Sequence, residues 1–312
     1  MKIKKSYKTM WKKFIIVITG VLICIVSYFY GLYSYPRNLW PLEVLRGMRN
    51  STPYLSNLGL GNYDNLGRLN TYPDKIKISC PQQSKDTGVL LVAGQSNSAN
   101  YAEKKYTTNF PDRVLNYHNG ECFVASSPLL GSTGENGEFI TLLADKLIKS
   151  ETYESVIIIS TGFDGSHISR WEDGGDLNQI LLKTINKINK YKINIFIWHQ
   201  GESDFRLSTS SKIYENSFRS LLKSLEQQGV SAKTFISIAT RCGFNPNWKA
   251  NNPTALGQTL LIDNEKIFLG ANTDKIIGEL DRQSDNCHLS ASGQELAARA
   301  FADSIIKSRN KI

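Results

Sequence analysis

Short apolar runs alternate with amphipathic stretches along most of this 312-residue chain, and that alternation restricts the possible fold more than any other feature. Runs such as 89–93 and 193–198 have strand length, whereas stretches such as 138–149 and 213–227 carry apolar residues at helical spacing. Strands that alternate with helices predict a parallel sheet with helices on both faces. We expect further strands at 114–117, 156–160, 235–239 and 267–269, and further helices at 177–188 and 292–307, the last opened by a capping-box pattern at Ser292 and Glu295.

The amino-terminal segment has a different character from the rest. Six lysines precede residue 14 with no acidic residue among them, and 22 uncharged residues follow at 14–35. This length spans a hydrocarbon core of about 30 Å, and the lysines keep the amino terminus in the cytoplasm. A cleaved signal peptide is the alternative, but the tyrosine-rich end of the run offers no clean cleavage site. We therefore expect a single-pass cell-membrane protein, with a basic tail at 1–13, a signal anchor at 14–35, a stalk at 36–80 and an exported domain at 81–312.

The formal net charge of +9 raises the question of a nucleic-acid partner. Its distribution argues against one, because removing the six amino-terminal lysines leaves 9 − 6 = +3 for the remainder. A mildly basic domain is not the electrostatic footprint of a polyanion-binding protein. We expect no nucleic-acid partner.

Ser96 lies in the motif Gly94-Gln95-Ser96-Asn97, directly after the expected strand at 89–93. A serine hydroxyl becomes a nucleophile when an imidazole takes its proton and a carboxylate fixes that imidazole. Asp285 and His288, three residues apart before the last helix, supply both groups. In parallel sheets, sites gather at the carboxyl ends of strands, where this motif and the segments 161–165 and 198–204 all fall. The sequence predicts a catalytic triad of Ser96, His288 and Asp285.

An acyl-transfer site also needs hydrogen-bond donors aimed at the oxyanion of the tetrahedral intermediate. The candidates are the backbone N–H of Ser96, the side-chain amide of Gln200 and the N–H of Gly134 in the glycine-rich stretch 131–137, which is alternatively a plain helix-entry loop. Gln95, Asn97 and Glu202 are the expected supporting residues, and Glu202 and Asp204 are expected to orient the Gln200 loop. The substrate-binding candidates are Arg170 and Trp171, which either contact a sugar or close the start of a helix.

The segments 94–97 and 198–204, with Asp285-x-x-His288, resemble the sialate O-acetylesterase type of carbohydrate esterase, within the SGNH-hydrolase superfamily. The segment 162–171 is similar to that family's Gly-Gly-Thr-Ser-Ile-x-x-Trp stretch, with changed surroundings at Gly165 and Ser166. The resemblance covers about residues 88–305. It implies an α/β fold of three layers, flavodoxin-like with a central parallel sheet, preceded here by one transmembrane helix. It also implies that Gln200 stands where other SGNH enzymes carry an asparagine.

The function expected from these features is removal of O-acetyl groups from sugars by a membrane-anchored, exported serine esterase that forms an acyl-enzyme. Its partners would be an O-acetylated carbohydrate and, through the amino-terminal helix, the membrane. Two alternatives remain: an acetyltransferase that uses the same nucleophile on a surface polysaccharide, and a non-catalytic sugar-binding domain. The intact Ser96, Asp285 and His288 favour an enzyme. No nucleotide or metal motif is present in the sequence, so we expect no cofactor.

The chain has five cysteines, of which Cys24 falls within the expected anchor. The other four permit two disulfides in three connectivities, and none has the C-x-x-C spacing typical of a zinc site. Cys242 follows the strand expected at 235–239, and Cys287 stands beside His288, so a bridge between them would tether the catalytic loop to the sheet. Cys80 and Cys122 would then pair. Four free thiols are the alternative.

Overall fold

The computed structural model describes residues 11, 18–30, 61–188 and 190–309. The chain divides into two units, Met1–Arg49 and Asn50–Ile312. In the first unit the described residues are helical. Most of the basic tail at 1–13, part of the expected anchor at 14–35 and most of the stalk at 36–80 lie outside the described residues. Across the described ranges, no helix combines the length and apolar character needed to cross a membrane.

The second unit is built on an eight-stranded sheet with the order β10-β9-β8-β4-β7-β5-β6-β3. The strands from β10 to β5 run parallel, with β4 at the centre between β7 and β8. Two short antiparallel strands, β6 and β3, complete the far edge, so the sheet is mostly parallel. The strands are β3 (Lys77–Ile78), β4 (Thr87–Gly94), β5 (Val114–His118), β6 (Glu121–Val124), β7 (Ser155–Ser160), β8 (Ile195–His199), β9 (Lys233–Ile238) and β10 (Ile267–Asn272).

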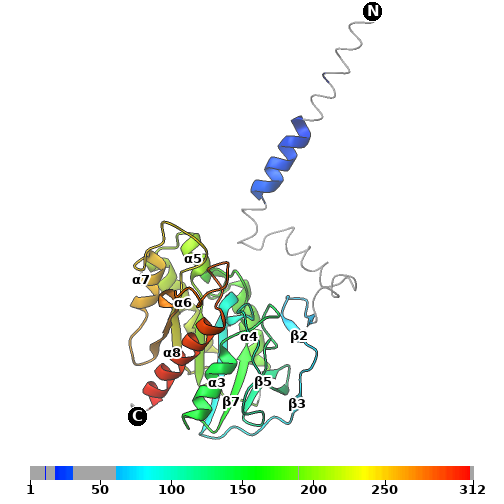
Figure 1. Cartoon of the computed structure of the whole chain (residues 1–312), viewed down its shortest axis with the longest axis vertical. Helices are drawn as coiled ribbons and strands as arrows, with labels where there is room; N and C mark the ends of the chain where they lie inside the picture. The colour runs from blue at the N-terminus through cyan, green and yellow to red at the C-terminus, as the bar shows by residue number, and fades with distance from the viewer. Residues whose placement is uncertain (1–10, 12–17, 31–60, 189, 310–312) are drawn as a thin grey trace, which may run out of the picture. The chain divides into compact units, whose positions relative to one another are not determined.

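Successive residues of the central strand point to opposite faces of the sheet, so each face has its own core. Leu90 and Val92 pack under α3 (Ile140–Lys149) and α8 (Ala291–Arg309), which lie side by side over that face (Figure 1). Val89 and Leu91 pack with α4 (Asp176–Asn186) and α6 (Ser211–Gln227) on the other face. The predicted α/β architecture of three layers is therefore confirmed.

Several elements depart from the sequence-based expectation. The last helix begins at Ala291, and it is Ser290 whose hydroxyl accepts a hydrogen bond from Gly293 N at 3.2 Å. Glu295 pairs instead with Lys146 on α3, so the predicted capping box is wrong. Part of the expected stalk belongs to the domain, because β1 (Asn62–Tyr63) and β2 (Leu69–Thr71) form a hairpin and β3 joins the sheet. The helices α5 (Glu202–Arg206) and α7 (Pro253–Leu260), and strand β6, were not anticipated.

Candidate active site

The turn that carries Ser96 begins where the carboxyl ends of β4 and β8 come into close contact. Gly94 has a φ of +130°, and a Cβ on it would lie 2.1 Å from the carbonyl oxygen of His199, so only glycine fits. Gln95 N then donates to that same carbonyl at 2.8 Å. Ser96 opens the short 3₁₀ helix η2 (Ser96–Ser98) and is 6% exposed. The serine is thus presented at a sharp strand-to-helix turn on the predicted edge of the sheet.

The loop before α8 holds Asp285 and His288 in contact. One carboxylate oxygen, Oδ1, accepts from the backbone N–H groups of Cys287 and His288 at 2.8 and 3.0 Å, and the other lies 2.5 Å from His288 Nδ1. Burial acts to raise the pKa of Asp285, but these three hydrogen bonds outweigh it and leave the pKa below its usual value. A carboxylate that accepts at Nδ1 leaves Nε2 as the basic nitrogen of the imidazole.

Asn97, the residue after Ser96, joins the two halves of the predicted triad. Its Oδ1 accepts from Leu289 N at 2.9 Å, and its Nδ2 donates to the carbonyl of Cys287 at 3.3 Å. The amide therefore holds the backbone on both sides of His288. The same Nδ2 donates to Glu202 Oε1 at 3.2 Å. Asn97 has the supporting contacts expected of it, and the nucleophile turn lies against the loop of the base.

Tyr101 lies beside His288 in the candidate site, and no sequence pattern predicted its role there. Its ring stacks on the His288 imidazole with centroids 5.8 Å apart and planes inclined by 25°. Gly134 packs against the same tyrosine: a Cβ on Gly134 would lie 2.6 Å from Tyr101 Cε2 and 2.7 Å from the carbonyl oxygens of Ala99 and Asn100. Within the described chain, no hydrogen bond joins Ser96 Oγ to His288, a contact that often tightens only when substrate binds.

Gln200 is the one oxyanion candidate that the observed contacts do not favour. The side chain is fully buried, and its Nε2 donates to Asp204 Oδ2 at 2.5 Å, to the carbonyl of Ser166 at 2.9 Å and to Gln95 Oε1 at 3.3 Å. Its own Oε1 accepts from the Tyr214 hydroxyl at 3.0 Å. An amide has two N–H groups, and internal acceptors use both. Gln200 therefore braces its loop rather than presenting a donor to substrate.

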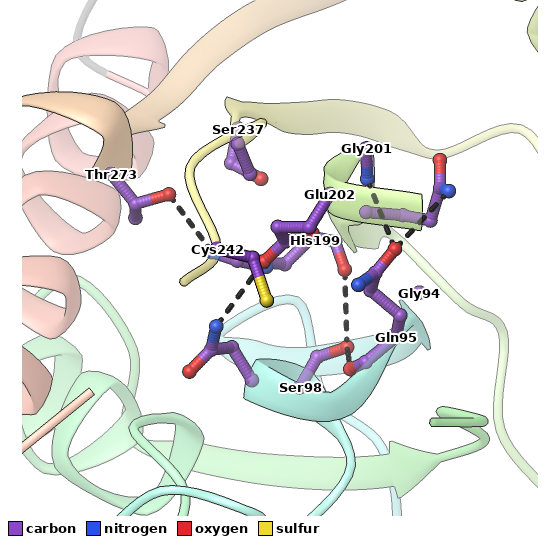
Figure 2. Close-up of polar contacts among 12 residues, drawn as sticks. Gly94, Gln95, Ser98, His199, Gly201, Glu202, Ser237, Cys242 and Thr273 are labelled. Atoms are coloured by element: carbon purple, nitrogen blue, oxygen red, sulfur yellow. Dashed lines mark hydrogen bonds and ion pairs between the residues drawn. The ribbon is translucent and has the colours of Figure 1, made fainter. Parts of the chain in front are cut away.

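Gln95 shares this bracing role. Its Oε1 accepts from the backbone N–H groups of Gly201 (Figure 2) and Ser203, each at 3.3 Å, and so links the β4 and β8 loops. Asp204 also accepts from Ile168 N at 3.0 Å and lies 2.8 Å from His167 Nε2. The supporting role expected of Gln95 and the orienting role expected of Asp204 both fit these contacts.

Of the two predicted substrate-binding residues, Trp171 lies in the core and Arg170 forms an ion pair. Trp171 is 0% exposed, packs against Trp198 with ring centroids 5.3 Å apart, and donates from Nε1 to Ser166 Oγ. Its ring faces are core surface and cannot stack on a sugar. Arg170 pairs with Asp176 at the start of α4. The buried indole contradicts a sugar contact by Trp171, and the contacts of both residues fit the alternative of closing a helical turn. Substrate binding by Arg170 stays a prediction.

Behind Asn97 lies a buried pair, His199 and Glu202, each 1% or less exposed. His199 Nε2 meets Thr273 Oγ1 at 3.1 Å (Figure 2), and since that hydroxyl donates to the Ile238 carbonyl, the ring nitrogen must be the donor. His199 Nδ1 then faces Glu202 Oε1 at 3.8 Å. Burial lowers the pKa of His199 to about 3 and raises the pKa of Glu202 to about 7. Both groups are therefore neutral when the surrounding pH is mildly acidic.

Glu202→Gln should change how stability depends on pH. Because the folded-state pKa of about 7 lies above the ordinary 4.5, Glu202 contributes stability that is complete below pH 4.5 and lost as the pH rises through 7. The free energy of unfolding of the wild type minus that of Glu202→Gln should fall by on the order of 3 kcal/mol between these limits. Urea unfolding at pH 4.5, 6 and 8 measures this difference, with Glu226→Gln on α6 as control. Parallel pH curves for wild type and Glu202→Gln would rule it out.

Arg282 organises the loop that carries the triad pair, and no short sequence motif marks it. The side chain is 8% exposed and donates to the carbonyls of Ile276 at 3.0 Å and of Thr273 and Cys287 at 2.5 Å each. Three backbone carbonyls from both ends of the loop thus converge on one guanidinium. Removing it would leave these buried acceptors unpaired.

The structure contains two disulfides, Cys80–Cys122 and Cys242–Cys287, which are the two pairs expected from the sequence. The second joins the loop after β9 to the residue beside His288. In the chain-entropy model, each of these crosslinks over some 42–45 residues contributes about 4 kcal/mol to stability. Among the described residues, no group of three or more histidine, cysteine, aspartate or glutamate side chains is arranged to hold a metal ion.

The chain is similar to a known protein family and to several solved structures. The family model described as carbohydrate esterase, sialic acid-specific acetylesterase, matches residues 86–307. No curated protein matches the chain. Among solved structures, a protein from Arabidopsis thaliana is 16% identical with a TM-score of 0.52, the match covering 72% of this chain and 98% of that protein. The same coverages hold for NanS (17%, TM-score 0.49) and for a family 3 carbohydrate esterase from Clostridium thermocellum (12%, TM-score 0.48). The Arabidopsis likeness shows the fold alone.

Proposed function

The chain belongs to the sialic acid-specific acetylesterase family of carbohydrate esterases, and on that premise we propose that Ser96, His288 and Asp285 form the triad with which it removes O-acetyl groups from sugars. As a member, it is a carboxylic ester hydrolase, an acetylesterase. The observation that carries the proposal for the triad is the double hydrogen bond of Asn97 to residues 287 and 289, on either side of His288. It sets the serine turn beside an imidazole that Asp285 already holds at Nδ1.

In the first step, Ser96 Oγ attacks the acetyl carbonyl while His288 Nε2 takes the hydroxyl proton. Asp285 stabilises the imidazolium that forms. The tetrahedral intermediate then collapses: the C–O bond to the sugar breaks, and His288 returns its proton to the departing sugar oxygen. The products are a free sugar hydroxyl and an acetyl ester on Ser96. Water, deprotonated by His288, attacks this ester; the bond to Ser96 Oγ breaks, His288 returns the proton to that oxygen, and acetate is released.

The oxyanion of each tetrahedral intermediate requires fixed donors. We assign this role to the backbone N–H groups of Ser96 and Gly134. Neither N–H donates a hydrogen bond elsewhere within the described chain. Gly134 has a φ of +80° and packs directly against the turn that follows Ser96, which supports a donor at this place. Gln200 would act indirectly, by stabilising the conformation of the loop after β8.

Acetate release from a panel of O-acetylated sugars tests the proposal. The full-length enzyme should release acetate into water from at least one acetylated acidic sugar, and the Ser96→Ala protein should not. A free sugar added as a competing acceptor separates hydrolysis from transfer. If the acetyl group moves to that sugar in preference to water, the protein is an acetyltransferase and hydrolysis is excluded as its main reaction. If no panel member is deacetylated, the proposed substrate class is wrong.

We further propose that the protein is anchored in the cell membrane by residues 14–35, with its catalytic domain on the exported side. The support is the uncharged 22-residue run behind six lysines. The two disulfides are a second support, because such bonds persist in oxidising compartments. An alkaline phosphatase reporter fused after residue 312 should be active in cells, since that enzyme needs export. An inactive alkaline phosphatase fusion, with a matched cytoplasmic reporter active instead, would refute this topology.

A further inference from the structure

One aromatic side chain near the proposed active site has no role in the mechanism above. Phe244 lies in the loop between β9 and α7 and is 85% exposed, the most exposed of the large apolar side chains in the described chain. A single exposed apolar residue on a surface usually needs no explanation. Phe244 does need an explanation, because its backbone is attached to the segment that carries the proposed triad pair.

The loop is attached to the segment that carries the triad pair. Gly243 N donates to the carbonyl of Asn286 at 3.1 Å, and Asn286 Nδ2 donates back to the carbonyl of Gly243 at 3.4 Å. The neighbouring residues are also joined: Cys242, which precedes Gly243, forms a disulfide with Cys287, which follows Asn286. Phe244 therefore follows directly on the two residues that are joined to the chain just before His288.

Further contacts hold the loop before Gly243 and at Trp248. Asp274 accepts from the backbone N–H groups of Thr240 and Arg241 at 2.7 and 2.8 Å. Thr240 Oγ1 in turn accepts from Trp248 Nε1 at 3.0 Å, and the Arg241 guanidinium lies 4.9 Å from the Trp248 ring centroid. These contacts fix the backbone on both sides of Phe244, so the position from which its ring projects is set before any ligand arrives, which reduces the entropy cost of binding.

The proposed chemistry specifies which part of a substrate this ring would meet. His288 must protonate the departing sugar oxygen, so the sugar lies on the His288 side of the scissile bond and the acetyl group on the oxyanion side. The C–H groups on one face of a pyranose carry partial positive charge and pack against the negative face of an aromatic ring. An exposed phenyl ring on a backbone that is tied to the His288 segment suits that face.

We propose that Phe244 is a stacking platform for the sugar ring of the leaving group and sets the preference of this enzyme for sugar esters over small acetyl esters. The inference rests on the proposed function and deepens it, because it names a residue that would bind the sugar, the alcohol part of the ester substrate. The ring takes no part in proton transfer and acts through binding.

The test compares two substrates on the full-length protein: an O-acetylated sugar from the panel above, and ethyl acetate, whose leaving group has no ring face. Phe244→Ala should lower kcat/KM for the sugar ester by about tenfold, mainly through a higher KM, and leave ethyl acetate unchanged. Phe244→Tyr should restore the sugar-ester value. Ile76→Ala is the matched control, since Ile76 is 64% exposed and precedes β3 on the other edge of the sheet.

Three other outcomes would contradict the proposed role of Phe244. Equal loss on both substrates would show that Phe244 maintains the catalytic loop, and an unchanged value for the sugar ester would show that the ring does not touch the substrate. Either result overturns the platform while leaving the esterase proposal intact. If the wild type hydrolyses ethyl acetate but no sugar ester, the proposed substrate class fails, and the platform fails with it.

Discussion

Ser96→Ala should lower the rate of acetate release by about 10⁴- to 10⁶-fold, the size of loss that follows removal of a triad nucleophile. No second hydroxyl can replace it, because the acyl-enzyme forms on the Ser96 oxygen itself. The residual rate would come from the oxyanion donors and from substrate positioning, which alanine leaves in place. Steady-state kinetics on the best panel substrate, with the folded state checked by circular dichroism, measures the effect.

Ser203→Ala provides the matched control. Ser203 is also a buried serine at this edge of the sheet, and its hydroxyl makes no hydrogen bond within the described chain. Deleting an unsatisfied buried hydroxyl should cost little or even stabilise the fold. Its activity should stay within about threefold of the wild type. A Ser96→Ala enzyme that keeps one per cent or more of wild-type activity would remove Ser96 from the role of nucleophile.

His288→Ala should produce a loss of the same order, because Ser96 would then lack the group that takes its proton. Asp285→Asn should cost less, about 10²- to 10⁴-fold. The amide can no longer hold the Nδ1 proton as a charged acceptor, but the aspartate side chain is 45% exposed, so solvent replaces part of its electrostatic effect. The measured quantity is kcat/KM for the same acetylated sugar.

A double variant and a control variant test whether Ser96 and His288 act together. The double variant Ser96→Ala with His288→Ala should be no slower than Ser96→Ala alone, because residues that act as one unit are not additive. His118→Ala, at the end of β5 where the ring contacts Asn70, should remain active within a few-fold. Additive losses in the double variant would indicate that the serine and the histidine act separately.

The fold and the proposed triad were accessible from sequence because their signals are local. The strand of branched residues before Gly94, the helical spacing of 138–149 and the Asp-x-x-His pair can each be read within a short window. The helix α7 also has a local signal at its start: Asn252 accepts from Ala255 N at 3.0 Å, and Pro253 follows it at the first helical position. Asparagine followed by proline is typical of a helix start.

The rest depends on contacts between distant segments. The sequence left open whether Trp171 contacts a sugar or closes the start of a helix, because the direction in which a tryptophan faces is set by what packs against it, here Trp198 on β8. The acceptors that occupy the Gln200 amide include the Ser166 carbonyl, 34 residues away. The stacking of Tyr101 on His288 and the convergence of carbonyls on Arg282 likewise have no signature in any short stretch of sequence.

The bond from Leu289 N to the Asn97 side chain closes over 192 residues, and this separation determines when the chain can become active. The ribosome adds His288 to the chain 288 − 96 = 192 residues after Ser96. Under the proposed mechanism, a nascent or truncated chain therefore contains the nucleophile without its base. Ester hydrolysis can begin only after the segment that carries His288 has been synthesised and lies against the Ser96 turn.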